Sequence, residues 1–445
     1  MNIPFTPLSV AERKTYLRRL ALELELAESS ICAALAQDFK KPTFEAVLTE
    51  TQYVKSALKD LLCNLNSWTK PKWVWPSLLN FPSVDYLIKE PYGAVLVISP
   101  WNYPFQLALC PAIAAFAAGN RVTVKPSEHT PATSIILAEL IGRVFPKEWI
   151  QVIPGDATVA QQLILQRWDY IFFTGSLAVG KIVAQAAAQH LTPTTLELGG
   201  KNPCIVHHSA EIPLTAKRIV WGKFINAGQT CIAPDYVLVD HKIKAQFIQA
   251  LQNEIKKAYG SNPELSPDYT RIVNAAHFNR LMGLLENQKI IFGGNVNAAD
   301  RYLSPTLVEE PEYTSPLMQE EIFGPILPIL SYQSESEIAS IIARYEKPLA
   351  LYVFATDHKF SQQMTTQFSF GGGCINDTVS QFNNKRLPFG GVGHSGYGAY
   401  HGKYSVAIFM HHKSIVHKSN WLDLPLRYAP YKNKLVWVQK LLRWL

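Results

Sequence analysis

The sequence predicts an α/β protein with two doubly wound domains, in which helices cover both faces of a mostly parallel sheet. From residue 94 onward, short apolar runs rich in β-branched residues alternate with longer helical patterns. Runs that are apolar along their whole length are typical of strands buried on both faces. The chain has 445 residues, of which 48% are hydrophobic, and this is enough for two domains that each bury a core.

The N-terminal part is predicted to be helical. Residues 8–69 repeat their apolar side chains at intervals of three and four, and Ser9 and Glu12 have the spacing of a capping box. A segment rich in proline and tryptophan follows at 70–82, and a β-like run follows at 84–90.

Two series of strands are predicted after these segments. The first series lies at 94–99, 121–125, 149–155 and 169–175. The second series lies at 204–208, 236–240, 326–332, 349–355 and 373–377. The change from one series to the next places the boundary between the domains near residue 198.

Polar turns follow three strands of the first series. Open α/β sheets bind ligands beyond the carboxyl ends of their strands, so these turns are candidate nucleotide contacts. They contain Asn102, then Lys125 and Glu128, and finally Gly175–Gly180, which opens a helix. Free N–H groups and the helix dipole at that last turn suit a pyrophosphate.

These turns also have a purely structural interpretation. Thr130 and Pro131 form a good N-cap and first helical position, so the preceding turn could serve only to start a helix. Gly175 could simply permit a tight turn from strand to helix.

The stretch GVGHSG at 391–396 matches the G-x-G-x-x-G fingerprint of dinucleotide-binding turns but lacks its context. The fingerprint needs a preceding strand and an acidic residue about 20 positions later. Here a polar, proline-containing run precedes it, and no Asp or Glu lies between residues 391 and 422. We therefore expect the nucleotide to bind elsewhere.

Composition excludes several classes of protein. The chain begins without an apolar segment after a basic patch, so no secretory signal is expected. No run approaches the roughly 18 apolar residues of a membrane span. The scattered cysteines suit free thiols in a reducing cytosol, and they are Cys32, Cys63, Cys110, Cys204, Cys231 and Cys374. The twelve histidines show no ligand spacing with cysteine or carboxylate partners, so no metal site is predicted.

The net charge of +7 is concentrated at the C-terminal end. Residues 380–445 contain ten Lys and Arg residues and a single acid, Asp423. The body of the protein therefore has no basic surplus, and nucleic-acid binding is not expected.

Two residues have surroundings that suit catalysis. Glu197 ends an apolar run before a Gly-Gly turn, where burial would raise its pKa toward that of a general base at neutral pH. Cys231 lies in a loop of small residues, where helix N-termini could stabilise it as a thiolate nucleophile. The structural alternatives are a satisfied buried acid and a small buried hydrophobic residue.

Seven ordered motifs now identify a family. The stretches PWNYP, VKPSEHTP, FTGS, LELGGKNP, NAGQTC, EEIFGP and LPFGGVGHSG resemble those of the NAD(P)-dependent aldehyde dehydrogenase superfamily, from about residue 8 to about 430. The short N-terminus and the sequence GVGHSGYGAYHGKYS are similar to the class 3 branch, which includes fatty and aromatic aldehyde dehydrogenases. The resemblance implies two Rossmann-like domains and a small β oligomerisation element.

The resemblance also implies roles for individual residues. Cys231 would attack the aldehyde, Asn102 would help to hold the resulting oxyanion, and Glu197 would activate water to hydrolyse the thioester. The residues implied to bind the cofactor are Trp101, Lys125, Glu128, Gly175, Ser176, Gly180, Glu321 and Phe323. Glu128 would bind ribose hydroxyls and disfavour a 2′-phosphate, so NAD is favoured and NADP stays open.

The same resemblance divides the chain. It implies an NAD(P)-binding domain at 1–80 and 94–198, a catalytic domain at 199–395, a bridging segment at 81–93 and 396–425, and a basic amphipathic tail at 426–445. The bridging strands would join two subunits of a homodimer, and their alternative is a pair of edge strands within one chain.

The tail contains a helical pattern with an apolar face. Residues 431–445 could contact a membrane surface, the partner subunit or the substrate entrance, and the three alternatives stay open. The apolar face consists of Leu435, Val438, Leu441, Leu442 and Leu445, with Trp437 and Trp444 beside it.

The predicted function is the oxidation of medium- or long-chain, aromatic or other lipophilic aldehydes to carboxylic acids. A cytoplasmic enzyme, peripheral to a membrane if the tail binds one, is expected. Two alternatives are a thiol esterase that uses the same cysteine, and a membrane-surface binding module that depends on the tail. The exact aldehyde is not fixed by the sequence.

Overall fold

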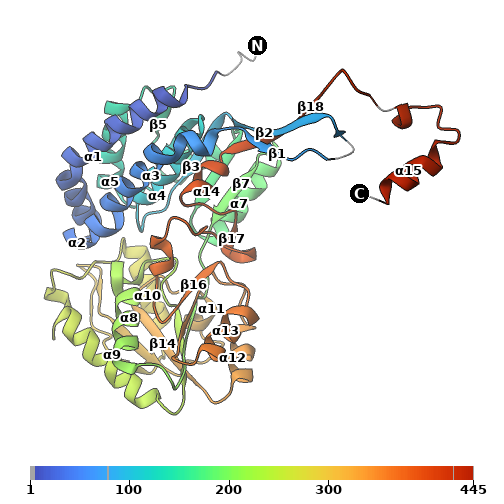
Figure 1. Cartoon of the computed structure of the whole chain (residues 1–445). Coiled ribbons are helices and arrows are strands. Elements are labelled where there is room, and N and C mark those ends of the chain that lie inside the picture. The colour runs from blue at the N-terminus through green and yellow to red at the C-terminus, as the bar shows by residue number, and fades with distance from the viewer. Residues whose placement is uncertain (1–5, 78–79, 424, 444–445) are drawn as a thin grey trace.

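The computed structural model describes residues 6–77, 80–423 and 425–443. A helical layer at the N-terminus precedes the first sheet (Figure 1). Ser9 caps the first helix as predicted, because its hydroxyl accepts the Glu12 N–H while the Glu12 carboxylate accepts the Ser9 N–H. The elements of this layer are α1 (Val10–Phe39), α2 (Thr43–Ala46), the π-helical turn η1 (Val47–Thr51) and α3 (Gln52–Thr69).

The first sheet has six strands in the order β17-β7-β6-β3-β4-β5. The chain starts at β3 in the interior, moves outward through β4 and β5, and returns to the other side of β3 through β6 and β7. These five strands are parallel, which confirms the first predicted series. They are β3 (Ala94–Ile98), β4 (Arg121–Lys125), β5 (Ile150–Val152), β6 (Tyr170–Thr174) and β7 (Thr194–Glu197), with β17 (Gly396–Tyr397) antiparallel at the edge.

Helices connect these strands and cover the sheet. The most apolar run of the sequence forms α4, in which every residue is buried, so this run is a core helix. The connecting helices are α4 (Gln106–Ala118), α5 (Pro131–Val144), α6 (Ala157–Ile164) and α7 (Leu177–Ala188). Among the described residues, no helix combines the length and the apolarity needed to cross a membrane.

The second sheet has seven strands in the order β10-β13-β14-β9-β8-β15-β16 and lies below the first in Figure 1. All its pairs except β10 with β13 are parallel, which confirms the second predicted series and the α/β fold class. The strands are β8 (Pro203–Val206), β9 (Tyr236–Asp240), β10 (Ile290–Phe292), β13 (Thr306–Glu309), β14 (Ile326–Tyr332), β15 (Ala350–Phe354) and β16 (Gly372–Ile375).

The second sheet is also covered by helices, and a small hairpin lies apart from it. The helices are α8 (Ile212–Phe224), α9 (Lys244–Tyr259), α10 (Ala275–Leu285), α11 (Pro316–Gln319), α12 (Glu335–Ile342) and α13 (His358–Gln367). The hairpin pairs β11 (Val296–Asn297) with β12 (Tyr302–Leu303).

A third sheet projects from the body as an arm (Figure 1). Its strands are β1 (Lys72–Val74), β2 (Ser83–Pro91) and β18 (Met410–Lys418), and β2 pairs with β18 along its whole length. Two segments from opposite ends of the sequence are thus joined. The short helix α14 (Lys403–Ala407) precedes β18, and the tail helix α15 (Lys434–Leu442) lies away from the body.

The start of α5 differs from the prediction. The helix does begin at Pro131, but the Thr130 hydroxyl is buried without a hydrogen-bond partner. The Asp38 carboxylate, from the end of α1, instead accepts the N–H groups of Ala132 and Thr133 at 3.0 and 2.9 Å. A carboxylate from another element therefore performs the capping that the sequence assigned to the local threonine.

Candidate active site

The oxyanion candidate Asn102 lies where the strand order of the first sheet reverses, just beyond β3. Its side chain is buried, and its amide donates to the Gln229 carbonyl at 3.1 Å. The Asn226 amide in turn donates to the Asn102 backbone carbonyl at 2.9 Å. The Asn102 turn therefore rests directly on the loop that leads to Cys231.

This loop is held in an unusual backbone conformation. Asn226, Ala227 and Gly228 all have positive φ, at 54°, 51° and 74°. Gly228 is required there, because a Cβ would lie 2.3 Å from the Gly324 carbonyl oxygen. The loop is therefore fitted against the EEIFGP segment.

The loop is also anchored to the second sheet on the far side of Cys231. The Asn202 amide donates to the carbonyls of Cys231 and Ala233 at 2.8 and 3.0 Å, and its oxygen accepts the Ala350 N–H at the start of β15. Cys231 thus lies at the amino ends of β8, β9 and β15, facing the carboxyl ends of the first sheet.

The protonation state of Cys231 contradicts the prediction of a stabilised thiolate. The residue is partly exposed, but its pKa is raised to about 12, mainly by burial of its sulfur and then by the Glu321 and Glu197 carboxylates. The N–H groups of Cys231 and Ile232 lower the pKa by less. The expected helix N-terminus is missing at this point, because Cys231 follows the short helix at Ile225–Gly228. Without a bound ligand, the residue is a thiol.

The Glu197 carboxyl lies in apolar surroundings, as predicted. It is the last residue of β7, its side chain is buried, and neither of its oxygens has a hydrogen-bond partner. Burial raises its pKa well above the ordinary value. The Glu197 carboxylate is among the charges that raise the Cys231 pKa.

The GVGHSG stretch packs against the strand that carries Glu197. Its last glycine, Gly396, starts β17 and pairs with Glu197 in antiparallel register. Gly396 has φ of 121°, and a Cβ would lie 2.0 Å from the Leu196 carbonyl oxygen. The glycine pattern here reflects a close approach of two backbones beside the catalytic acid.

Glu321 meets the Gly-Gly turn that follows Glu197. The Glu321 carboxylate packs on Gly199, where a Cβ would lie 2.2 Å from one of its oxygens and would displace that side chain. Burial raises the Glu321 pKa to about 8, Asp235 adds to this, and the Gly200 N–H opposes it.

The remaining predicted residues surround the same edge. The Trp101 and Phe323 rings pack edge to face at 5.2 Å, and Trp101 also contacts His277. The buried Lys125 ammonium donates to the Pro126 carbonyl at 2.6 Å and lies 3.4 Å from the Glu128 carboxylate.

Ser176 caps α7 directly after β6, and its hydroxyl accepts the Val179 N–H. Gly175 is needed for space, because a Cβ would lie 2.6 Å from the Phe173 ring. Gly180 similarly packs against Leu198. The first N–H groups of α7 therefore open onto the site, and an anion could bind them.

Comparison with known proteins identifies this arrangement. A model of the aldehyde dehydrogenase family matches residues 4–415. The chain belongs to the aldehyde dehydrogenase family. The thiol esterase and the membrane-surface module are thereby disfavoured as its main function, and the chain is an NAD(P)-dependent oxidoreductase.

Relatives of this aldehyde dehydrogenase support its placement near class 3. It is 47% identical over 97% of its length to the 4,4'-diaponeurosporen-aldehyde dehydrogenase of Staphylococcus aureus (strain NCTC 8325 / PS 47), of which it covers 94%. It is 43% identical over 97% of its length to aldehyde dehydrogenase family 3 member B2 of Mus musculus, covering 90% of that protein.

Solved structures have the same fold. The substrate-bound state of Staphylococcus aureus AldH matches with a TM-score of 0.95 and 46% identity, over 98% of this chain and 95% of that one. An aldehyde dehydrogenase of Mycobacterium tuberculosis complexed with NAD+ matches with a TM-score of 0.84 and 26% identity, over 96% and 88%. The GapN of Methanocaldococcus jannaschii complexed with NADP matches with a TM-score of 0.83 and 26% identity, over 93% and 90%.

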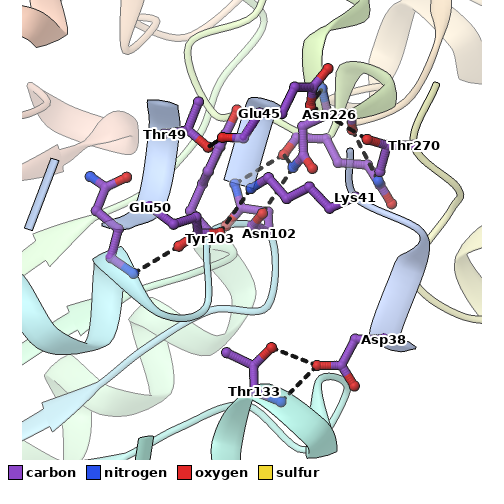
Figure 2. Close-up of polar contacts among 12 residues, drawn as sticks. Asp38, Lys41, Glu45, Thr49, Glu50, Asn102, Tyr103, Thr133, Asn226 and Thr270 are labelled. Atoms are coloured by element: carbon purple, nitrogen blue, oxygen red, sulfur yellow. Dashed lines mark hydrogen bonds and ion pairs between the residues drawn. The ribbon is translucent and has the colours of Figure 1, made fainter. Parts of the chain in front are cut away.

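Sequence reasoning missed a group of residues that brace both catalytic loops of this aldehyde dehydrogenase. Lys41 and Glu50 form a fully buried ion pair at 2.8 Å, and the Lys41 ammonium lies 4.0 Å from the centre of the Tyr103 ring (Figure 2). Glu50 also accepts the Gln106 N–H at 2.8 Å, and the Tyr103 hydroxyl bonds to Thr230 at 2.7 Å.

A second acid, Glu45, binds the loop that leads to Cys231. The Glu45 carboxylate accepts the Asn226 N–H at 3.0 Å, and burial raises its pKa to about 7 (Figure 2). Glu45 precedes the π-helical turn at Val47–Thr51, and Glu50 lies within it, five residues further on. Turns of this kind are frequent at functional sites. In the sequence, two acidic residues in a helical stretch are typical of a solvent-exposed surface. Their role becomes visible only in the structure, through the π-helical turn and the buried Lys41.

We expect Glu50→Gln to destabilise the protein, because the Lys41 charge would stay buried without its partner. The free energy of unfolding should fall by about 3–5 kcal/mol in urea titrations. Lys41→Met combined with Glu50→Gln removes both charges and should recover part of that loss. A double variant no more stable than the single one would contradict the buried ion pair.

Proposed function

We propose that the chain oxidises lipophilic aldehydes to carboxylic acids, with Cys231 as nucleophile and Glu197 as general base. The observation that carries this proposal is the convergence of the Asn102 amide, the Cys231 thiol and the Glu197 carboxyl between the two sheets. A soft sulfur nucleophile suits the reaction, because it both attacks a carbonyl and leaves from a thioester.

The chemistry begins at the sulfur. Cys231 transfers its proton to a nearby ionised carboxylate, Glu197 or Glu321, and attacks the aldehyde carbon, which turns the carbonyl oxygen into an oxyanion. One N–H of the Asn102 amide binds Gln229, so its second N–H is free to donate to that oxyanion together with the Cys231 backbone N–H. Such donors contribute about 3 kcal/mol each to stabilisation of the transition state.

The second half of the reaction depends on Glu197. Bound NAD(P)+ supplies the acceptor for the hydride that leaves the substrate carbon, and an acyl thioester stays on Cys231. The Glu197 carboxylate takes a proton from water, and the resulting hydroxide releases the acid. A carboxyl with a raised pKa is a stronger base than an exposed one, which suits this role.

The residues around the edge fit a dinucleotide. The N-terminus of α7 with Gly175, Ser176 and Gly180 would hold the pyrophosphate, and Lys125 with Glu128 would hold the adenosine ribose. Glu321 would hold the nicotinamide ribose, with Trp101 and Phe323 near the ring. The Glu128 side chain is 36% exposed, and among the described residues its ion-pair partner is Lys125. Its negative charge would therefore repel a 2′-phosphate, which favours NAD over NADP.

The preference for lipophilic aldehydes is supported by a cleft beside the nucleophile loop. The cleft has a volume of about 370 Å³, and Ile225, at the start of the loop, and Glu45, which binds Asn226, both line it. Its lining combines the apolar Phe44, Leu48, Val220, Trp221 and Tyr259 with the charged Lys217, Glu254, Lys257 and Asp268. The relative named for diaponeurosporen-aldehyde acts on a lipophilic substrate of this kind.

We also propose a cytoplasmic homodimer whose tail meets a membrane surface. All six cysteines are free thiols, as in a reducing compartment. Among the described residues, no strand pairs with the outer edge of β18, so a second copy could extend the arm. On α15, Leu435, Val436 and Trp437 are exposed beside lysines. The predicted apolar positions Trp444 and Leu445 lie outside the described residues.

A panel of aldehydes tests the proposal. We expect kcat/KM with NAD to rise about fourfold per added methylene until the cleft is full, since each buried CH₂ contributes about 0.8 kcal/mol, and NADP to be the poorer cofactor. The same panel is run on a chain that ends at residue 430, with and without anionic liposomes. This chain should keep its activity in solution but no longer sediment with liposomes. A flat profile along the panel would overturn the substrate class.

The truncated chain also separates the roles of the tail. Loss of activity toward long aldehydes without liposomes would place the tail at the substrate entrance, and dissociation to monomers would place it on the partner subunit. Either result would overturn the membrane role.

A further inference from the structure

The second sheet has a polar group at its carboxyl edge, opposite the catalytic cysteine. His207 and His208 directly follow β8, and Asp240 ends β9. These strands are parallel neighbours, so the three residues meet at one edge. Asn202, which binds the Cys231 carbonyl, directly precedes β8 at the other edge. The group is therefore separated from the active site by the full length of the strands.

The three side chains are close enough to share one ion. One ligand atom from each of His207, His208 and Asp240 lies within 4.8 Å of the other two. The His208 Nδ1 atom is 2.9 Å from the Asp240 Oδ2 atom. Two ligand atoms that each lie about 2.1 Å from one zinc ion, at the tetrahedral angle, are about 3.4 Å apart, so this pair would separate by about 0.5 Å to hold an ion between its atoms.

The ligand candidates are held in place by their neighbours. The Asp240 side chain is only 9% exposed, and its other oxygen accepts the Lys242 N–H at 3.0 Å and lies 3.5 Å from the His241 ring nitrogen. The carboxylate therefore has one oxygen fixed by the chain and one directed at His208.

The His207 ring is held in place through Ser209, which in turn binds residues that follow β15. Its Nδ1 atom bonds to the Ser209 hydroxyl at 2.8 Å, and that hydroxyl accepts the Thr356 and Asp357 N–H groups at 3.1 and 3.2 Å. Its ring also stacks on Phe360 at 4.2 Å between centroids. The Ser209 N–H also donates to this Nδ1 atom at 3.3 Å, so these contacts leave Nε2 as the ring nitrogen that could bind an ion once it has lost its proton.

We propose that His207, His208 and Asp240 bind one divalent first-row transition-metal ion, of the type of Zn²⁺. Two imidazoles and one carboxylate match the ligands that zinc takes, whereas calcium and magnesium prefer oxygen ligands alone. Water completes the coordination. The ion joins the ends of β8 and β9 and stabilises the second domain. This site does not depend on the proposed function, because it is remote from Cys231.

Titration calorimetry of the untagged, chelator-treated full chain with Zn²⁺ tests the site. The parent should bind one equivalent, and His208→Ala should weaken that binding at least tenfold. His208 is half exposed, so this variant should fold and keep its dehydrogenase activity. The matched control is His411→Ala with His412→Ala, which removes another adjacent histidine pair, exposed on β18. This control should bind zinc like the parent.

A cobalt spectrum identifies the ligands independently. Co²⁺ bound to imidazole and carboxylate lacks the thiolate-to-metal charge-transfer band that a cysteine ligand would produce. Loss of binding in Cys231→Ala, or a charge-transfer band in the parent, would place the ion on the thiol and overturn the proposal. Equal zinc affinity of the parent and His208→Ala would overturn it as well.

Discussion

Cys231→Ala is expected to abolish NADH production and to leave NAD binding intact. Without the sulfur no thiohemiacetal forms, so the aldehyde carbon has no route to hydride transfer, and the rate should fall by at least about 10⁴-fold. NAD binding should be unchanged, because the cofactor turns at Lys125 and α7 belong to the other sheet. Steady-state NADH formation measures the first quantity, and titration calorimetry with NAD measures the second.

The control for this prediction is Cys63→Ala, which removes an exposed thiol elsewhere in the chain. This variant should have the activity of the parent. Cys231→Ala that still reduces NAD at near the parental rate would refute the assignment of the nucleophile.

Because its pKa is raised, the accessible Cys231 thiol stays protonated and is protected from unwanted reactions. At neutral pH the sulfur is protonated, mainly because burial opposes its ionisation. Glu321 and Glu197 are the nearby groups that could receive its proton when they are ionised and a substrate is in place. The alkylation rate of Cys231 in the unliganded enzyme should therefore rise about tenfold per pH unit throughout the range from 6 to 9.

The positions of Asn102 and Glu197 in the fold could be predicted from the sequence, because they lie at the ends of strands that are continuous apolar runs. Asn102 follows β3, and Glu197 ends β7. The order of the strands then brings these ends to one edge. The chemistry of Cys231 could not be predicted in this way, because its pKa depends on Glu321, which reaches it from a distant segment across Gly199.

Contacts between distant segments account for the other differences. Thr130 has the right residue type for a cap, but Asp38 takes its place from α1. Lys41 and Glu50 are charged residues at a helical turn, and their burial depends on how the N-terminal layer packs on the Asn102 turn. His208 and Asp240 are separated by 32 positions and meet only because their strands are neighbours.

Glu197→Gln is expected to separate the two halves of the reaction. The variant should produce one rapid equivalent of NADH per active site and then stall, because an amide cannot take the proton from water. The steady-state rate should fall by about 10²–10⁴-fold, and intact-protein mass spectrometry should find the acyl group on Cys231. Glu128→Gln is the matched control, which should alter the KM for NAD and keep steady turnover. Steady turnover of Glu197→Gln near the parental rate would remove Glu197 from the role of base.

The Glu197→Gln variant also tests whether the Glu197 carboxyl is buried, because burial makes the free energy of unfolding depend on pH. Burial raises the Glu197 pKa well above its ordinary value of about 4.5, so the folded protein retains a proton that the unfolded chain releases as the pH rises. The contribution of this group to stability therefore decreases above about pH 4.5 and continues to decrease up to the folded pKa.

Glutamine cannot ionise, so the stability of Glu197→Gln relative to the parent should increase with pH across that window. Contributions of Glu45 and Glu321 are present in both proteins and cancel in the comparison. Urea unfolding between pH 5 and 9 measures the difference, and a difference independent of pH would mean that Glu197 is solvated or paired in solution.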